Sequence, residues 1–293
     1  MKTIDQYITL KDNRKLGFAE YGNSDGCPII YCHGSQSSRF EMHYDMTFAT
    51  KNGLRIITVD RPGHGLSDFN AVGSILSFAK DVKALTEYLK IEKFSVAGMS
   101  AGSPFALALA YSYPENIHKV SIISGFAPFT NLSKTYLSKE VKMMLSLAKS
   151  FPLLLRMMLR IQSRQLAKNP KKALKGFLKM MSVPDQEVLK NKKVVDIIET
   201  MFKEAFRNGS EGVAYEISKL LVKDWHFELN KIQVPVSFWQ GQKDNNVPSQ
   251  WAKLMRNEIP NATLKTFPNE GHLIIFEHSE EIFTTLKEGY NPE

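Results

Sequence analysis

Short, nearly continuous apolar segments alternate with helical patterns along most of this 293-residue chain. Strands that are apolar along their whole length are typical of a parallel sheet with both faces covered by helices. The apolar segments lie at residues 29–32, 54–59, 94–97, 120–123, 234–239 and 262–267. Patterns with a helical period lie between most of them, at residues 74–89, 101–113, 249–257 and 280–287. The alternation therefore predicts an α/β fold.

Two further strand-like segments precede this pattern, at residues 7–10 and 15–21, and a polar turn separates them. They predict a hairpin at the start of the chain. Together the segments predict a mostly parallel, eight-stranded sheet flanked by helices.

Residues 126–233 break the alternation, because they contain helical patterns and no clear strand. The helical patterns cover residues 139–149, 153–165, 170–181, 185–206 with breaks, and 211–222. We expect an all-helical cap (lid) domain at 126–233, inserted after the sixth strand. Residues 1–125 and 234–293 would form the core domain.

Positive charge is concentrated in this predicted cap. The chain carries 38 Lys and Arg against 30 Asp and Glu, and residues 126–233 hold 20 of the basic and 10 of the acidic residues. A solvated helical surface explains this excess, and weak attraction to anionic substrates or surfaces is the alternative. The sequence has no zinc-finger spacing or RNA-binding signature, so we expect no nucleic-acid partner.

The two cysteines, Cys27 and Cys32, flank one apolar segment. In a strand, five residues span roughly 16 Å, whereas a disulfide needs Cα atoms within about 7 Å. We therefore expect free thiols and a cytoplasmic location. The N-terminus lacks an apolar signal core, and the apolar stretch at 151–161 contains two arginines and is too short to span a bilayer. No integral membrane association is expected.

The segment Gly98-Met99-Ser100-Ala101-Gly102 has the pattern G-x-S-x-G. An apolar strand leads into it and an alanine-rich helix leads out, which is the strand-to-helix turn that this motif requires. A serine at the tip of such a turn is exposed for attack, so Ser100 is the candidate nucleophile.

A serine hydroxyl needs a neighbouring base, and a carboxylate must orient that base. His272 follows the segment at 262–267, and Asp244 follows the segment at 234–239, so both are expected at the sheet edge where Ser100 lies. His278 ranks second as the base. The predicted catalytic residues are Ser100, Asp244 and His272.

An oxyanion needs two backbone N–H donors. We assign one to Ala101, the residue after the nucleophile, and the other to Ser35 in the loop after the segment at 29–32. His33, in the same loop, is interpreted as structural.

With these motifs the chain resembles the α/β-hydrolase superfamily, as a serine-nucleophile, capped, esterase- or lipase-like member. The matching elements are His33-Gly34, the run at 60–67, the segments at 98–102 and 241–244, and Gly271-His272. The resemblance implies hydrolysis without a cofactor or metal. Serine as nucleophile argues against haloalkane dehalogenases and epoxide hydrolases, which use aspartate there. The loop at 33–36 lacks the glycines of proline iminopeptidases and of hormone-sensitive-lipase-like esterases.

The predicted function is hydrolysis of a carboxylic ester, or a related acyl bond, of a small and largely apolar molecule through an acyl-enzyme. The protein is expected to act as a monomer or homodimer. Two alternatives stay open: a carbon–carbon bond hydrolase with the same triad, and a non-enzymatic, ligand-sensing partner in stress signalling.

Methionine is frequent in the predicted cap. Seven of the twelve methionines lie there: Met143, Met144, Met157, Met158, Met180, Met181 and Met201. They would form either the packed interior of the cap or a flexible apolar lining for substrate.

Overall fold

The computed structural model describes residues 2–43, 46–179 and 181–291. Eight strands form one sheet in the order β1-β2-β4-β3-β5-β6-β7-β8. The pairs β1–β2 and β2–β4 are antiparallel, and all other neighbouring strands are parallel. The strands are β1 (Lys2–Thr9), β2 (Lys15–Gly22), β3 (Cys27–Cys32), β4 (Leu54–Val59), β5 (Phe94–Met99), β6 (Ile117–Ile123), β7 (Val236–Gly241) and β8 (Ala262–Phe267). The predicted eight-stranded, mostly parallel sheet is confirmed.

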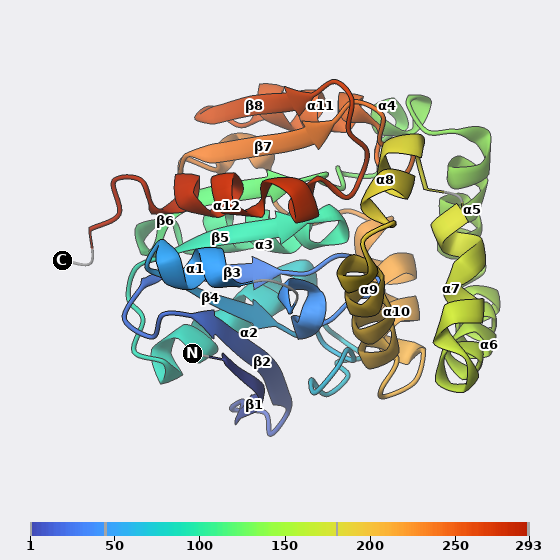
Figure 1. The fold of residues 1–293 in the computed structure, drawn as a ribbon, viewed down its shortest axis with the longest axis horizontal. Coiled ribbons are helices and arrows are strands. Elements are labelled where there is room, and N and C mark those ends of the chain that lie inside the picture. The colour runs from blue at the N-terminus through green and yellow to red at the C-terminus, as the bar shows by residue number, and fades with distance from the viewer. Residues whose placement is uncertain (1, 44–45, 180, 292–293) are drawn as a thin grey trace.

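Helices cover both faces of the sheet (Figure 1). On one face lie α1 (Thr47–Lys51) and α12 (Ile274–Lys287), and on the other lie α2 (Ile75–Tyr88), α3 (Ser103–Ser112) and α11 (Ser249–Glu258). Alternate side chains of β3 enter the two cores: Ile29 and Tyr31 pack with α12, whereas Ile30 and Cys32 pack with α2 and α3. This double burial explains why the parallel strands are apolar along their length.

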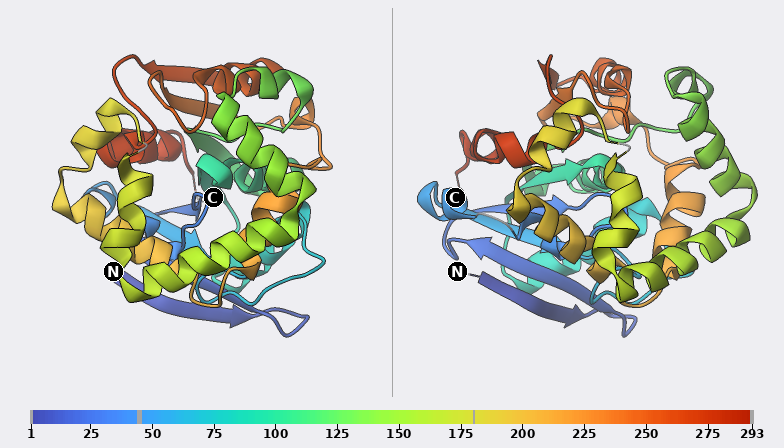
Figure 2. Two further views of the ribbon diagram at one scale, coloured as in Figure 1. Left: turned by 90° about the vertical axis from the view of Figure 1, so that its right-hand side faces the viewer. Right: turned by 45° about the vertical axis from the view of Figure 1, so that its right-hand side comes forward.

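Between β6 and β7 the described residues form helices and no strand. Up to residue 221 these are α4 (Asn131–Thr135), α5 (Lys139–Ser150), α6 (Pro152–Lys168), α7 (Pro170–Lys179), α8 (Val183–Val188), α9 (Lys192–Ala205), α10 (Glu211–Tyr215) and the π-helical turn η4 (Glu216–Leu221). We refer to α4 through η4 as the cap. The helices from α5 to α10 lie beyond the C-terminal ends of the parallel strands (Figure 1), and α5 and α6 form an outer arch (Figure 2).

Several short elements were not expected from the sequence. They are the 3₁₀ turns η1 (Arg39–Met42), η2 (Ser100–Gly102), η3 (Pro114–Asn116) and η5 (Leu229–Lys231), together with the short helices α1 and α4. The last helix begins at Ile274 instead of residue 280, and non-helical backbone at His278 kinks it. A single turn carries too few residues to show a helical period, so the sequence pattern could not reveal these turns.

The cap methionines correct one expectation. Met143, Met144, Met157 and Met158 are exposed, with 52–71% of their surface open, so they are not packed in the interior of the cap. Met181 and Met201 are buried in the apolar cluster of the cap. Met180 lies outside the described residues.

Within the part of the chain that the structure describes, no helix is both long and apolar enough to cross a membrane. Cys27 and Cys32 are buried and free, as their spacing predicts.

Candidate active site

Ser100 lies at a strained turn between β5 and α3. Its backbone adopts a φ of +50°, in the left-handed region that non-glycine residues rarely occupy. Such strain persists only where the surrounding structure enforces it, and it is frequent at active sites. The turn packs closely on the end of β3, because a Cβ atom on Gly102 would lie 2.0 Å from the carbonyl oxygen of Cys32. This close packing places Ser100 beside the loop that follows β3.

His272 and Asp244 meet at the same edge of the sheet. They lie on the loops that follow β8 and β7, and His272 Nδ1 is 2.7 Å from Asp244 Oδ2. The other carboxylate oxygen of Asp244 accepts the backbone N–H groups of Asn246 and Val247, each at 2.8 Å. Asp244 is therefore held in place before it contacts the histidine. Ser124 Oγ donates to the carbonyl oxygen of His272 at 3.0 Å and fixes its backbone.

Competing effects act on the pKa of His272, whose side chain is almost fully buried. Burial lowers this pKa, whereas the charge and hydrogen bond of Asp244 raise it, and the carboxylates of Asp185 and Glu41 raise it further. The carboxylates prevail, so the pKa of His272 lies above its usual value. An imidazole in this setting is well suited to accept a proton and to hold it.

A cap residue holds the histidine loop from the other side. Asp185 of α8 is buried and accepts the backbone N–H of Leu273, the residue after His272, at 2.8 Å. Its other oxygen accepts the hydroxyl of Ser182 at 2.6 Å. A Cβ atom on Gly271 would lie 2.2 Å from that hydroxyl oxygen, so only glycine fits here. The cap and the histidine loop therefore form one packed unit.

The loop after β3 is held by a buried carboxylate of its own. Glu41 accepts the backbone N–H of Gly34 at 2.8 Å and the hydroxyl of Tyr31 at 3.1 Å. Burial raises the pKa of the Glu41 carboxyl to about 6, against these hydrogen bonds. A Cβ atom on Gly34 would lie 3.7 Å from Ser100 Cβ, so this loop borders the candidate nucleophile.

The cap also reaches this loop through Arg61. The guanidinium donates to the carbonyl oxygens of His33 and Gly34 and pairs with Glu216 of η4 at 2.5 Å, and both charged side chains are buried. His33 is buried too, and burial, with Arg61 nearby, lowers its pKa well below the usual value. The backbone N–H of Arg61 donates to Nε2 of His33, so the proton of the neutral imidazole is on Nδ1. This Nδ1–H of His33 donates to the carbonyl oxygen of Gly34. A neutral His33 thus braces the loop, which fits its predicted structural role.

The predicted site residues come from four neighbouring loops. Ser100 and Ala101 follow β5, Ser35 follows β3, and Asp244 and His272 follow β7 and β8. His278, the second-ranked base, is not part of this group. It contacts Glu270 at 2.7 Å and stacks on Phe267.

The supporting roles of Glu41, Asp185 and Glu216 could not be seen in the sequence pattern. Only Asp185 had a visible signal, since Ser182-x-x-Asp185 is a capping-box pattern at the start of α8. That pattern indicates a helix start and does not reveal the contact with Leu273. Among the described residues, no group of three or more His, Cys, Asp or Glu side chains could hold a metal ion.

Residues 28–279 match the model of the alpha/beta hydrolase fold family, and the chain belongs to that family. The AB hydrolase superfamily protein YisY of Bacillus subtilis is 25% identical over 98% of this chain and 100% of its own length. The bifunctional esterase/perhydrolase DCH of Acinetobacter calcoaceticus is 25% identical over 91% of this chain and 92% of its own. An esterase from Exiguobacterium antarcticum has the same fold, with a TM-score of 0.70 and 21% identity over 98% and 99% of the two chains. These likenesses support hydrolase chemistry in general and do not identify a substrate.

Proposed function

We propose that the protein is a serine hydrolase that cleaves a carboxylic ester, or a related acyl bond, through an acyl-enzyme. One observation carries the proposal: Asp244 binds His272 at 2.7 Å on the sheet edge where Ser100 occupies a strained turn. A carboxylate, an imidazole and a serine in chain order Ser, Asp, His form the arrangement that activates a hydroxyl for acyl transfer in this fold.

In this mechanism His272 takes the proton of the Ser100 hydroxyl as the oxygen attacks the substrate carbonyl. Asp244 keeps the proton on Nδ1, so Nε2 is the basic nitrogen, and it stabilises the imidazolium that forms. The backbone N–H groups of Ser35 and Ala101 receive the oxyanion, and loss of one such donor typically costs about 10²–10³ in rate. His272 then protonates the leaving group and activates the water that releases the acid.

The apolar cluster of the cap supports an apolar substrate. Its buried residues include Leu273, directly after His272, and the partly buried Phe40, Ile217 and Phe276 pack against the cluster. An acyl or alkyl group that enters beside His272 would therefore meet apolar side chains. The exposed methionines of the cap give no support to this part of the proposal.

A reducing, cytoplasmic location is part of the proposal. Burial raises the pKa of both cysteine thiols to about 12, which keeps them protonated and unreactive. Cell fractionation tests this location, and recovery of the protein outside the cytoplasm would contradict it.

The proposal is tested by hydrolysis of p-nitrophenyl esters from acetate to palmitate with wild type and Ser100→Ala. Wild type should cleave some of these esters and Ser100→Ala none, and longer acyl chains should be cleaved faster than acetate. Equal activity of both proteins would refute the role of Ser100. If both are inactive, ester hydrolysis is refuted. The carbon–carbon hydrolase and the ligand-sensing protein then become the preferred hypotheses. Equal turnover of acetate and decanoate would refute the apolar preference.

A further inference from the structure

The outer side of the cap combines exposed apolar side chains with unbalanced positive charge. Helix α6 carries Leu153, Leu154, Met157, Met158 and Ile161, whose surfaces are 38–79% exposed. At 3.6 residues per turn, Met157 lies nearly opposite the buried Leu159 and Leu166. The first three turns of α6 are therefore apolar on the buried side and on the exposed side.

A helix side that is apolar is normally covered by protein or lipid, and here the exposed side is apolar as well as the buried one. Helix α6 packs on α5, α7, α9 and α10, whereas Leu153, Met157 and Ile161 keep 50–79% of their surface open. Met143, Met144 and Phe151 of the neighbouring segment, exposed at 55–71%, extend the apolar area along the outer arch seen in Figure 2. Large contiguous apolar patches on a surface usually mark a site of interaction.

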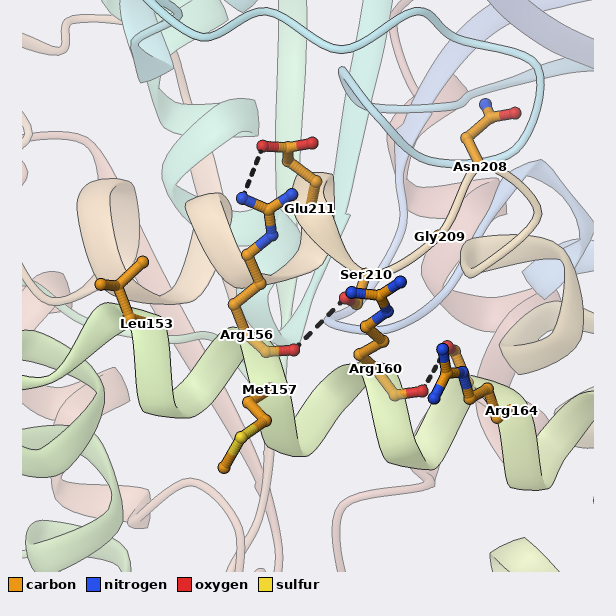
Figure 3. A pocket seen from close by; sticks show the side chains of 10 residues that line it. Leu153, Arg156, Met157, Arg160, Arg164, Asn208, Gly209, Ser210 and Glu211 are labelled. Carbon is orange, nitrogen blue, oxygen red and sulfur yellow. Dashed lines mark hydrogen bonds and ion pairs between the residues drawn. The ribbon is translucent and has the colours of Figure 1, made fainter.

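Charge decides which kind of partner fits this area. Residues 141–184 contain ten Lys and Arg and no Asp or Glu. Three of the arginines, Arg156, Arg160 and Arg164, follow one another at successive turns of α6 and line a hollow of about 480 Å³ (Figure 3). Arg156 pairs with Glu211 at 3.0 Å, while Arg160 and Arg164 form no ion pair with a described residue. The partner must therefore present both apolar and anionic groups.

We propose that the outer side of α5 and α6 docks on the surface of an anionic lipid bilayer. In this arrangement α6 lies parallel to the bilayer, Leu153, Met157 and Ile161 enter the acyl-chain boundary, and the arginines bind headgroup phosphates. Basic helices with an apolar face bind lipid surfaces in this way, with affinity from both buried apolar area and attraction to anionic lipids. A second copy of the chain fits poorly, because a symmetric contact would bring two uncompensated positive surfaces together. The inference does not depend on the bond that the enzyme cleaves.

Flotation of the full-length protein with lipid vesicles tests the docking. Wild type should bind vesicles of phosphatidylcholine with phosphatidylglycerol and not vesicles of phosphatidylcholine alone. Binding should weaken with salt, since the screening length falls from about 10 Å at 0.1 M to about 3 Å at 1 M. Failure of wild type to bind the anionic vesicles at low salt would overturn the proposal.

Two variants separate the apolar and the charged contributions. Leu153→Ser/Met157→Ser/Ile161→Ser should weaken binding at least about tenfold, since each buried methylene adds to the affinity. Arg160→Glu/Arg164→Glu should weaken it about 25-fold or more, because one basic residue near an anionic surface contributes roughly fivefold. Neither variant alters a buried side chain, so circular dichroism should match wild type.

Lys11→Glu/Lys253→Glu is the matched control, because it makes the same change in net charge at exposed positions of the core. Its binding should stay within about twofold of wild type, since these lysines lie outside the proposed docking surface. Equal losses in the control and the arginine variant would show that net charge alone drives binding, and would overturn the docking surface. Unchanged binding of the triple serine variant would also overturn the docking surface. The docking surface would also be overturned if wild type formed a dimer that the serine substitutions dissociate and did not bind vesicles.

Discussion

The two sides of the cap are built in opposite ways, although each has an arginine–glutamate pair. On the inner side, Glu216 pairs with Arg61 at 2.5 Å, with 3% and 1% of the side chains exposed. At the solvent-exposed contact of α6 with α10, Glu211 pairs with Arg156 at 3.0 Å, with 47% and 49% of the side chains exposed. Only five positions separate the two glutamates. The inner pair holds the loop beside Ser100. The outer pair is solvated and lies beside Arg160 and Arg164, which form no ion pair with a described residue.

Other buried carboxylates of the cap also hold the inner side against the core. Asp185 holds the histidine loop, Glu216 holds the loop after β3 through Arg61, and Glu204 of α9 pairs with the buried Arg39 at 2.7 Å. Thus three carboxylates of a segment with a net positive charge point inward to the core. Two of these carboxylates, Asp185 and Glu216, hold the loops of the candidate site, whereas Glu187, Asp196 and Glu211 form exposed pairs with basic residues of the cap.

Removal of the inner glutamate, Glu216, or of the outer glutamate, Glu211, should give the largest difference in stability between the two sides of the cap. Glu216→Ala leaves the Arg61 guanidinium buried without its partner, and we expect the free energy of unfolding to fall by about 3–5 kcal/mol. Glu211→Ala should change it by less than about 0.5 kcal/mol, because exposed pairs contribute little. Urea unfolding of both variants measures this difference. Similar losses of unfolding free energy in Glu216→Ala and Glu211→Ala would mean that the inner pair does not fix the cap.

Apolar side chains of one helix provide the second comparison. Leu159 of α6 is buried in the cluster of the cap, and Leu159→Ala should lower the free energy of unfolding by about 2–4 kcal/mol through the cavity it creates. Met157, two residues away, is exposed, and Met157→Ala should change stability by less than about 0.5 kcal/mol. Thermal or urea unfolding checks both values. A comparable cost for Met157 would show that its side chain is packed in solution.

The smallest of the three effects concerns Asp185. Asp185→Asn removes a negative charge near His272, so the pKa of His272 should fall. Because His272 must be neutral to act as a base, the acidic limb of kcat/KM should move to lower pH. We also expect kcat/KM at its optimum to fall up to about tenfold, since the histidine loop loses a strong acceptor.

Asp196→Asn is the control for this prediction. Asp196 lies on the exposed side of α9 and pairs with Lys192, away from His272. Its pH profile should match wild type. An acidic limb that moves to higher pH in Asp185→Asn, or that stays in place, would contradict the influence of Asp185 on the histidine.

Features with a local pattern could be predicted from the sequence. Double burial of the parallel strands gives continuous apolar segments, and the helices between them keep a helical period. Ser100, Asp244 and His272 each follow a strand, so their placement at one sheet edge follows from the strand pattern alone. The supporting contacts lack such a pattern. Asp185 and Leu273 are 88 residues apart, and Arg61 and Glu216 are 155 apart, so only the packed structure reveals them.

The methionines of the cap show that the sequence also does not reveal which apolar side chains are buried. Composition suggested either packing inside the cap or a lining for substrate, because apolar side chains are usually buried. In α6, however, both sides are apolar, and only the positions of α7, α9 and α10 decide which side is covered. Met157 and Met158 lie on the uncovered side.

The measurement that tests the central claim most directly is covalent labelling with a fluorophosphonate, followed by mass spectrometry. The account predicts one label per chain on Ser100 and none on Ser100→Ala. It also predicts labelling slowed by about 10³–10⁴ in Asp244→Asn, in which His272 loses the carboxylate that fixes its tautomer. A label on another residue, or equal labelling of wild type and Ser100→Ala, would contradict the assignment of Ser100 as nucleophile.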